Sequence, residues 1–414
     1  MNRITRYIHA QGTVSEVLRH RHGGRTPSGM LAFSDIRRPV VFWNITNRCN
    51  LRCSHCYIRA GPGERREDEL TTEEGMALID DLAGMRVPLL LFSGGEPLVR
   101  EDFWDLARHA NDCGLTTALS TNGTLITPAA ARRLCDAGVE YVGVSLDGAT
   151  AETHDRMRNA PGSFLLALRA LENCRSAGLK CGVRVTATRE NYAEIPDLID
   201  LSLDCGAERF CVYWLVPSGR GGEGYGALQL GSREIAGLLD LLVQKAREGD
   251  PEAMEFLTVD APQDAVYLFR RLREEDPPAY ESMCTLLARS GVGCSAGDRI
   301  ANIDPAGSIY PCQFAQLPAL RVGSIRDRPF SAVWNDPDNG VLSAFRRKKD
   351  LVGGSCGRCP YRETCGGGCR IRALAATGDL WAEDPLCPLC REETPGDAPP
   401  AGSPEARTQP PALR

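Results

Sequence analysis

The chain has 414 residues, of which 43% are hydrophobic and 25% charged, and its formal net charge is −6. This length exceeds one ordinary hydrophobic core, so we expect at least two globular domains. The acidic balance argues against a nucleic-acid surface, the lack of an 18-residue apolar run argues against a membrane span, and the first residues lack the apolar core of a signal peptide.

Cysteine is unusually frequent, with 18 residues of this type. Because the sequence predicts no secretion, we expect a cytoplasmic protein in a reducing compartment. There, clustered cysteines indicate metal or cluster ligands rather than a disulfide framework.

Residues 1–36 are polar and predict an irregular leader with one short helix near 14–19. Short apolar runs then alternate with helical segments, and glycines stop four of these helices just before the next strand, at Gly114, Gly138, Gly178 and Gly206. The predicted strands are 40–43, 87–92, 116–119, 141–146, 181–188 and 209–215. Strands alternating with helices predict an α/β fold with a parallel sheet, which we expect to be an open (βα)6 barrel.

A cysteine-rich segment, 47–57, directly follows the first predicted strand and is called the cysteine loop below. It holds Cys49, Cys53 and Cys56 in a Cys-x3-Cys-x2-Cys spacing. Chance predicts this spacing about 0.03 times in a chain with so many cysteines. Three thiolates are one fewer than the four that usually hold an iron–sulfur cluster, so one iron would be free to bind a ligand. A ligand role for His55 is an alternative, although the triplet is complete without it.

Small, polar or glycine-rich segments follow the other predicted strands, and in a parallel barrel all of them open on one face. Gly94 and Gly95 would let the backbone approach a ligand closely, and Glu96 offers a carboxylate to an ammonium group. Ser120 and Asn122 could bind a ribose or cap a turn. The segments are Ser-Gly-Gly-Glu-Pro at 93–97, Ser-Thr-Asn-Gly at 120–123, Ser-Leu-Asp-Gly at 145–148, Thr186 with Thr188, and 217–221.

Residues 222–280 break the alternation and predict a helical connector beside the barrel, with helices at 232–247 and 263–273. A second group of cysteines follows, and its Cys-x2-Cys pair leaves a zinc ribbon as the alternative. This group comprises Cys284, Cys294, Cys312, Cys356, Cys359, Cys365, Cys369, Cys387 and Cys390. Residues 393–414 are rich in Pro, Ala and Gly and predict a disordered tail.

Six further cysteines lie within the predicted barrel without ligand spacing, and we expect them to be buried thiols that pack as small hydrophobes. They are Cys113, Cys135, Cys174, Cys181, Cys205 and Cys211.

The cysteine loop and the segments after the strands resemble those of the radical S-adenosylmethionine (SAM) enzymes. This resemblance implies a [4Fe–4S] cluster on the cysteine loop, whose open iron chelates the amino and carboxylate groups of SAM. It also implies SAM contacts from a set of residues after the strands, in which Arg156 is the competing choice for the last member. The set is Gly94, Gly95, Glu96, Ser120, Asn122, Ser145 and Arg158.

Cysteines of the second group match all seven cysteines of the SPASM extension of radical SAM enzymes, and this resemblance implies one or two auxiliary [4Fe–4S] clusters. One would bind Cys356, Cys359, Cys365 and Cys387, with Cys390 as an alternative to the last. The other would bind Cys294, Cys312 and Cys369, with Cys284 as a candidate fourth ligand. We therefore expect a barrel at 37–221, a connector at 222–280 and a SPASM domain at 281–392.

Three stretches, the leader through 43–46, 258–267 and 369–385, resemble the radical SAM enzymes that tailor tetrapyrroles in heme d1 formation and siroheme-dependent heme biosynthesis. The resemblance implies hydrogen abstraction by a 5′-deoxyadenosyl radical and removal of acetate side chains from 12,18-didecarboxysiroheme, giving Fe-coproporphyrin III. It also implies an electron donor of the flavodoxin or ferredoxin type. Arg220, Arg370 and Arg372 are candidate partners for the substrate's carboxylates. The alternative is a SPASM-type maturase that modifies ribosomal peptides or activates sulfatases.

Overall fold

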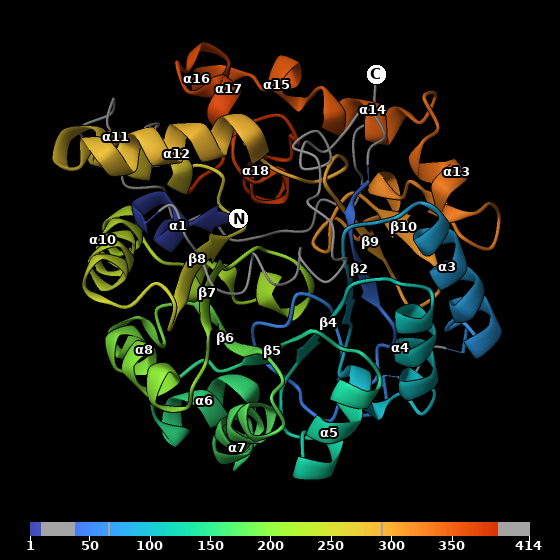
Figure 1. Cartoon of the computed structure of the whole chain (residues 1–414). Helices are drawn as coiled ribbons and strands as arrows, with labels where there is room; N and C mark the ends of the chain where they lie inside the picture. Colours follow the sequence, from blue (N-terminus) through green and yellow to red (C-terminus); the bar gives the residue numbers. More distant parts are fainter. Residues whose placement is uncertain (10–37, 65–66, 291–292, 388–414) are drawn as a thin grey trace.

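The computed structural model describes residues 1–9, 38–64, 67–290 and 293–387, which fold around one sheet of eleven strands (Figure 1). The predicted helix at 14–19, Cys390 and the tail at 393–414 lie outside the described residues. In spatial order the strands are β1 (Asn2–Arg3), β8 (Glu255–Val259), β7 (Arg209–Trp214), β6 (Cys181–Ala187), β5 (Tyr141–Ser145), β4 (Thr117–Thr121), β3 (Leu90–Ser93), β2 (Val40–Asn44), β9 (Ile300–Ile303), β10 (Ser308–Tyr310) and β11 (Gly323–Ser324).

Every neighbouring pair from β2 to β8 is parallel, and the helices between these strands surround the sheet as an arc (Figure 1). This confirms the predicted α/β fold with a parallel βα sheet. The helices of the arc are α3 (Thr72–Gly84), α4 (Phe103–Asp112), α5 (Pro128–Asp136), α6 (Ala151–Arg158), α7 (Ser163–Ser176), α8 (Ile195–Asp204) and α10 (Ser232–Glu248).

Local signals define the ends of these helices. Thr71 caps α3: its hydroxyl accepts a hydrogen bond from the Glu74 N–H at 3.2 Å, and the Glu74 carboxylate accepts one from the Thr71 N–H at 2.9 Å. The four glycines predicted to stop helices all have positive φ, between 73° and 78°, which costs glycine no steric strain. The helix boundaries therefore follow from residues close in sequence.

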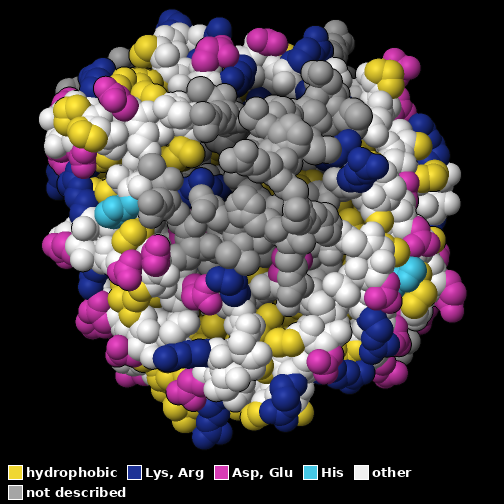
Figure 2. All heavy atoms as spheres, in the orientation of Figure 1, with side chains coloured by type: hydrophobic (Ala, Val, Ile, Leu, Met, Phe, Trp, Pro, Cys, Tyr) yellow, Lys and Arg dark blue, Asp and Glu magenta, His cyan; other side chains and the backbone are white. Residues whose placement is uncertain are grey.

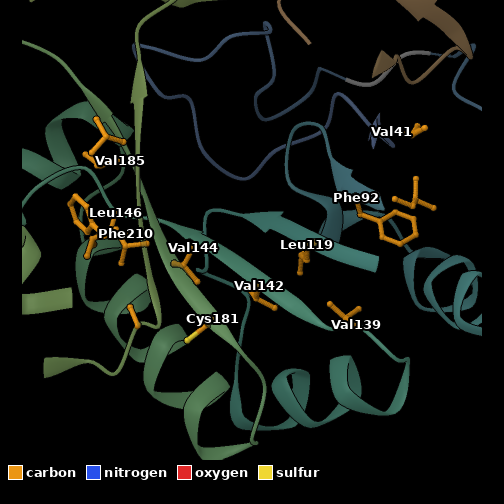
Figure 3. Close-up of a cluster of buried hydrophobic side chains, with 14 of the residues drawn as sticks. Val41, Phe92, Leu119, Val139, Val142, Val144, Leu146, Cys181, Val185 and Phe210 are labelled. Atoms are coloured by element: carbon orange, nitrogen blue, oxygen red, sulfur yellow. The ribbon is translucent and has the colours of Figure 1, made fainter. Parts of the chain in front are cut away.

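Side chains alternate between the two faces of the parallel strands. On β5, Val142 and Val144 are fully buried on the outer face, where they pack with Leu119 of β4 against the helices (Figure 3). Ser145 faces the inside of the barrel and lines the cavity described below. The main core thus lies between the sheet and the helical arc. The inner face carries a smaller apolar cluster of Leu91, Ala118 and Tyr141 as well as the residues of the cavity.

The stretch predicted as a helical connector contains a further parallel strand. Its residues pair with β7 from Arg209↔Glu255 to Tyr213↔Val259, so β8 extends the barrel sheet. The predicted helices on either side are present as α10 and α11 (Asp264–Glu275). The five residues of β8 match no known loop motif, and the sequence pattern therefore missed it.

The C-terminal region continues the same sheet. Strand β9 pairs parallel with β2, while β10 and β11 extend it as antiparallel strands. Beyond the sheet lie α12 (Pro277–Ser290), α13 (Phe330–Trp334), α14 (Gly340–Arg346), α15 (Lys348–Leu351), α16 (Gly354–Arg358), α17 (Arg362–Cys365) and α18 (Arg370–Thr377). These elements occupy one end of the molecule (Figure 1).

The surface carries both signs of charge. Figure 2 shows basic and acidic side chains interspersed over one face, as expected for a chain with a small net charge. Among the described residues, no helix is both long and apolar enough to cross a membrane.

The burial of β8 yields a stability prediction. Leu257 is fully buried in this strand, and Leu257→Ala should lower the free energy of unfolding by about 2–5 kcal/mol because it leaves a cavity. Denaturant midpoints of the variant and the parent protein measure this change. Leu203 on α8 is 40% exposed and is the matched control, so Leu203→Ala should cost less than about 0.5 kcal/mol. Equal costs would mean that β8 is not part of the cooperative core.

Candidate functional site

The cysteine loop lines a cavity at the carboxyl ends of the parallel strands. Burial, together with the nearby thiolates of Cys53 and Cys56, raises the pKa of Cys49 to about 12. The three thiols therefore lie close together in a partly buried space. Ionising all three requires a compensating positive centre, which an iron–sulfur cluster supplies.

Gly94 and Gly95 let the segment after β3 pack directly against the cysteine loop. A Cβ atom at Gly94 would lie 2.5 Å from the Thr46 carbonyl oxygen, and one at Gly95 would lie 2.1 Å from the Arg48 carbonyl oxygen. The Gly95 N–H donates to the Thr46 carbonyl at 2.7 Å. Both glycines line the cavity. Glycine is required at these positions because their backbone packs closely against the start of the cysteine loop.

Glu96 joins the loops after β3 and β4. Its carboxylate accepts hydrogen bonds from the Thr121 hydroxyl and the Asn122 N–H, each at 2.8 Å, and burial raises its pKa to about 7. Glu96 is fully buried and is not among the residues that line the cavity. Its predicted contact with the amino group of SAM stays a prediction, because this geometry gives the carboxylate a structural role.

The other predicted polar residues line the cavity. Asn122 lies beside the cysteine loop, where its side-chain nitrogen Nδ2 donates to the side-chain Oδ1 of Asn50 at 2.9 Å and lies 3.9 Å from the Cys49 sulfur. Ser120 and Ser145 line the cavity from the ends of β4 and β5. The structure therefore brings these three residues to the same side of the barrel as the cysteines.

Of the two candidate arginines on α6, only Arg158 reaches the cavity. One guanidinium nitrogen lies 3.6 Å from the Cys53 sulfur, and another lies 2.5 Å from the Asp147 carboxylate. The Arg156 side chain is 47% exposed and pairs with Glu152 on the surface. The geometry therefore favours Arg158.

Asp147 is a central residue of the site, although its sequence context indicated only a turn. Burial alone would raise its pKa, but Arg158 and His55 hold it well below its usual range. His55 Nε2 lies 3.0 Å from the Asp147 carboxylate, and the Thr186 N–H donates to that carboxylate at 2.9 Å. His55 lines the cavity with its Nε2 directed to Asp147.

Several cavity residues were missed from sequence. Arg184 on β6, Tyr213 on β7 and Asp260 just after β8 line the cavity, as do Gln313 and Phe314. The last two immediately follow a predicted cluster ligand, Cys312, which is a signal that sequence reasoning could have used. Asp260 lies in the stretch 258–267 that resembles tetrapyrrole-tailoring enzymes, but it follows a strand that was not predicted, so no site role was assigned to it.

The three arginines proposed as substrate partners differ in position. Arg220 lines the cavity, and its Nε donates to the Cys53 carbonyl at 3.0 Å. Arg370 is 1% exposed and donates to the Ala382 carbonyl at 2.7 Å, and Arg372 is fully buried against Asp384 at 2.9 Å. The prediction is wrong for these last two, because sequence shows their charge but not their burial.

The structure brings cysteines of the second group together in two sets, and these are the sets that the resemblance implies. Four of them line a second cavity, namely Cys356, Cys359, Cys365 and Cys387. Three others lie together: burial raises the pKa of Cys312, and the neighbouring thiolates of Cys294 and Cys369 raise it further. Each group could hold one cluster.

Cys284 lies on α12, where it is hydrogen-bonded to Tyr280. Its role as a fourth ligand for the group of three stays a prediction.

Of the six further cysteines within the barrel, four are buried and two are partly exposed. Cys174, Cys181, Cys205 and Cys211 are buried as predicted. The prediction is wrong for Cys113 and Cys135, which are partly exposed near the C-terminal ends of α4 and α5.

The buried ion pair of the site can be tested by matched substitutions. Arg158→Gln leaves Asp147 charged and unpaired, so it should lower the free energy of unfolding by about 3–5 kcal/mol and reduce the iron retained by the cysteine loop. Arg156→Gln on the same helix should cost less than about 0.5 kcal/mol. Denaturant midpoints and iron content after anaerobic reconstitution measure both effects. Similar losses in the two variants would contradict the assignment of Arg158.

Cysteine substitutions should remove iron in blocks. Changing all three cysteines of the cysteine loop to Ala should lower the iron content by about four per chain. The double variant Cys356→Ala/Cys359→Ala should remove about four others, because it leaves only two ligands in the second cavity. Cys205→Ala is the control and should leave iron unchanged, since this thiol is buried in the core. Zinc in place of iron would favour the zinc-ribbon alternative.

Comparison with known proteins identifies the family of two regions of the chain. The family model for the radical SAM superfamily matches residues 43–202, and that for the SPASM iron–sulfur cluster-binding domain matches residues 294–360. Fe-coproporphyrin III synthase of Methanosarcina barkeri is 40% identical over 92% of this chain and 96% of its own length. Pre-heme d1 synthase of Dinoroseobacter shibae is 37% identical over 86% and 88%, and mycofactocin maturase MftC of Mycobacterium ulcerans is 34% identical over 83% and 86%.

Solved structures share the fold. Streptococcus suis SuiB bound to S-adenosylmethionine has a TM-score of 0.65 and 19% identity, covering 85% of this chain and 78% of its own. The enzyme anSMEcpe with bound AdoMet and a peptide has a TM-score of 0.62, covering 84% and 94%. The radical SAM domain implies a [4Fe–4S] cluster and SAM, and the SPASM domain indicates auxiliary iron–sulfur clusters. This chain therefore belongs to the radical SAM superfamily, among the members that carry a C-terminal SPASM domain.

Proposed function

We propose that this radical SAM enzyme acts in siroheme-dependent heme biosynthesis, where it removes acetate side chains of 12,18-didecarboxysiroheme to give Fe-coproporphyrin III. One observation carries this proposal: the 40% identity with Fe-coproporphyrin III synthase extends over 96% of that relative. A second tetrapyrrole enzyme, pre-heme d1 synthase, is similar over most of both chains. The likeness thus includes the barrel, β8 and the SPASM region together.

The cavity residues support a division of roles in cofactor binding. When bound, the [4Fe–4S] cluster and SAM supply the radical that abstracts hydrogen from the substrate. We assign the cluster to the cysteine loop. Gly94, Gly95, Ser120, Asn122 and Ser145 line the side of the cavity nearest to it, where they can contact SAM.

Arg158 supplies positive charge beside the cluster thiolates, and Asp147 orients it. Both residues are buried, so this charge is held in place before the cofactor binds.

Part of the cavity lining is apolar. Trp214, Leu215 and Val216 lie at and after the end of β7, and Phe314 of the SPASM region also lines the cavity, with its ring 5.8 Å from that of Tyr57 in the cysteine loop. Arg220 is the cavity-lining member of the three arginines considered as partners for carboxylates. Apolar walls with a few cationic groups match the chemistry of a carboxylated tetrapyrrole, and they also exclude water from a radical site.

The auxiliary cysteines complete the proposed cofactor set. One [4Fe–4S] cluster would bind Cys356, Cys359, Cys365 and Cys387, which line the second cavity. Another would bind the group of three buried cysteines around Cys312, with Cys284 as the candidate fourth ligand. We place the enzyme in the cytoplasm, with a flavodoxin or ferredoxin as electron donor. We keep the barrel at 37–221 and the SPASM domain at 281–392, with β8 of the 222–280 segment joined to the barrel sheet.

A peptide maturase is the second candidate. It is favoured by the likeness to mycofactocin maturase MftC, at 34% identity, and by the shared fold of SuiB. The tetrapyrrole enzymes are more similar in sequence, at 37–40% identity. We therefore rank tetrapyrrole chemistry first.

An anaerobic turnover experiment tests the proposed function. The reconstituted enzyme with 12,18-didecarboxysiroheme, SAM and dithionite should release 5′-deoxyadenosine, and mass spectrometry should show loss of the acetate groups. The variant that lacks all three cysteines of the cysteine loop is the control and should give neither product. Release of 5′-deoxyadenosine with no change in the mass of the tetrapyrrole would contradict the proposal.

A further inference from the structure

Arg184 extends from β6 into the barrel and lines the cavity. Its guanidinium carbon lies 4.6 Å from the centroid of the Tyr213 ring, and one nitrogen donates to the Ser120 hydroxyl. Gly143 on the neighbouring strand makes room for it, since a Cβ atom there would lie 2.5 Å from Arg184 Cδ. The side chain is therefore placed by its surroundings, with its charged end at the cavity.

The charge of Arg184 has no counter-ion among the residues that the structure describes. Three buried arginines do have one: Arg209 lies 2.9 Å from Glu255, Arg158 lies 2.5 Å from Asp147, and Arg372 pairs with Asp384. Arg370 instead donates to the backbone carbonyls of Leu380 and Ala382. A guanidinium held in a low-dielectric cavity without a carboxylate is unfavourable. Such a group is ready to pair with an anion that enters the cavity, and its planar fork fits a carboxylate.

Asp260 is the second unusual polar group of this cavity. It has a left-handed backbone, with φ of 72°, which is strained for a residue with a side chain. Its Oδ2 atom is buried and has no hydrogen-bond partner among the described residues. Arg372 donates to its carbonyl oxygen at 2.6 Å and so anchors the strained segment.

The protonation of Asp260 keeps Arg184 available. Burial raises the pKa of Asp260 to about 7, although Arg372, the N-terminal ammonium group and Arg184 act in the opposite direction. Near neutral pH the carboxyl group is therefore partly protonated and can donate a hydrogen bond. It is not a full counter-ion for Arg184, and it need not repel an incoming anion.

We propose that Arg184 and Asp260 form a carboxylate-binding subsite for the substrate: Arg184 pairs with one carboxylate side chain, and the Asp260 carboxyl group donates a hydrogen bond to it. This inference rests on the proposed function, because it takes the substrate to be a carboxylated tetrapyrrole. SAM also carries a carboxylate, so the test must separate the two sources of this group.

The test compares an acid with its ester. Anaerobically reconstituted holoenzyme is titrated with 12,18-didecarboxysiroheme and with its methyl ester, and binding is followed by the absorbance of the tetrapyrrole. A separate titration measures SAM affinity. The variants are Arg184→Gln, Arg184→Lys and Asp260→Asn. The matched control is Arg133→Gln, since Arg133 also lies over an aromatic ring, 4.2 Å from the Trp104 centroid, but outside the residues that line the cavity.

The parent protein should bind the acid more tightly than the ester. Arg184→Gln should weaken binding of the acid roughly 10- to 100-fold, the range for a lost charge-assisted hydrogen bond, with little effect on the ester. Asp260→Asn should weaken the acid less, because its amide can still donate. Arg184→Lys should be intermediate, since it keeps the charge without the fork. SAM affinity should be unchanged throughout, and Arg133→Gln should match the parent protein.

Three outcomes would overturn the inference. One is an Arg184→Gln variant that distinguishes acid from ester as well as the parent protein does. Another is a loss of SAM affinity with unchanged tetrapyrrole binding, which would assign Arg184 to SAM. The third applies if Arg184→Gln does not retain its clusters. The same comparison is then made on Arg184→Lys, and acid binding equal to that of the parent protein would overturn the role of the planar guanidinium. A parent protein that binds neither tetrapyrrole would instead contradict the proposed function.

Discussion

The buried ion pair between Arg158 and Asp147 is the interaction on which the site depends. Burial and the neighbouring thiolates of Cys53 and Cys56 raise the pKa of Cys49, so ionisation of this loop needs nearby positive charge. Arg158 provides it 3.6 Å from the Cys53 sulfur, and Asp147 fixes Arg158 while also receiving His55. Because both side chains are buried, removing either one would leave the other as an uncompensated buried charge. The electrostatics of the cluster loop are therefore set by the protein itself.

Much of the fold was predictable because its signals are local. The capping box at Thr71 and the glycines that stop helices act within a few residues, and so do the spacings of the cysteines. Strand β8 was missed since its five residues lack a recognisable loop motif, and only the pairing with β7, more than forty residues earlier in the chain, makes it a strand. Contacts between distant segments decide such elements, and they cannot be derived from a single sequence pattern.

The candidate site shows the same limit for side chains. Ligand types could be predicted, because thiolates at metal-binding spacing have few other uses. The partners of charged residues could not be predicted. Arg370 and Arg372 were candidate substrate ligands but are buried, whereas Arg184 was assigned no role and lines the cavity. Glu96 was predicted to face a ligand, yet its carboxylate is used by Thr121 and Asn122. Charge is visible in a sequence, but burial and direction are not.

Asp384 connects the SPASM region to the wall of the barrel cavity. Its carboxylate accepts a hydrogen bond from the Cys369 N–H at 2.6 Å and pairs with Arg372, which in turn donates to the Asp260 carbonyl. A cavity residue and a predicted auxiliary ligand are thus joined through two buried side chains. Buried charge pairs have few alternative arrangements. A shift of Cys369 should therefore pass through Asp384 and Arg372 and also shift Asp260. The SPASM region is in this sense a part of the cavity wall.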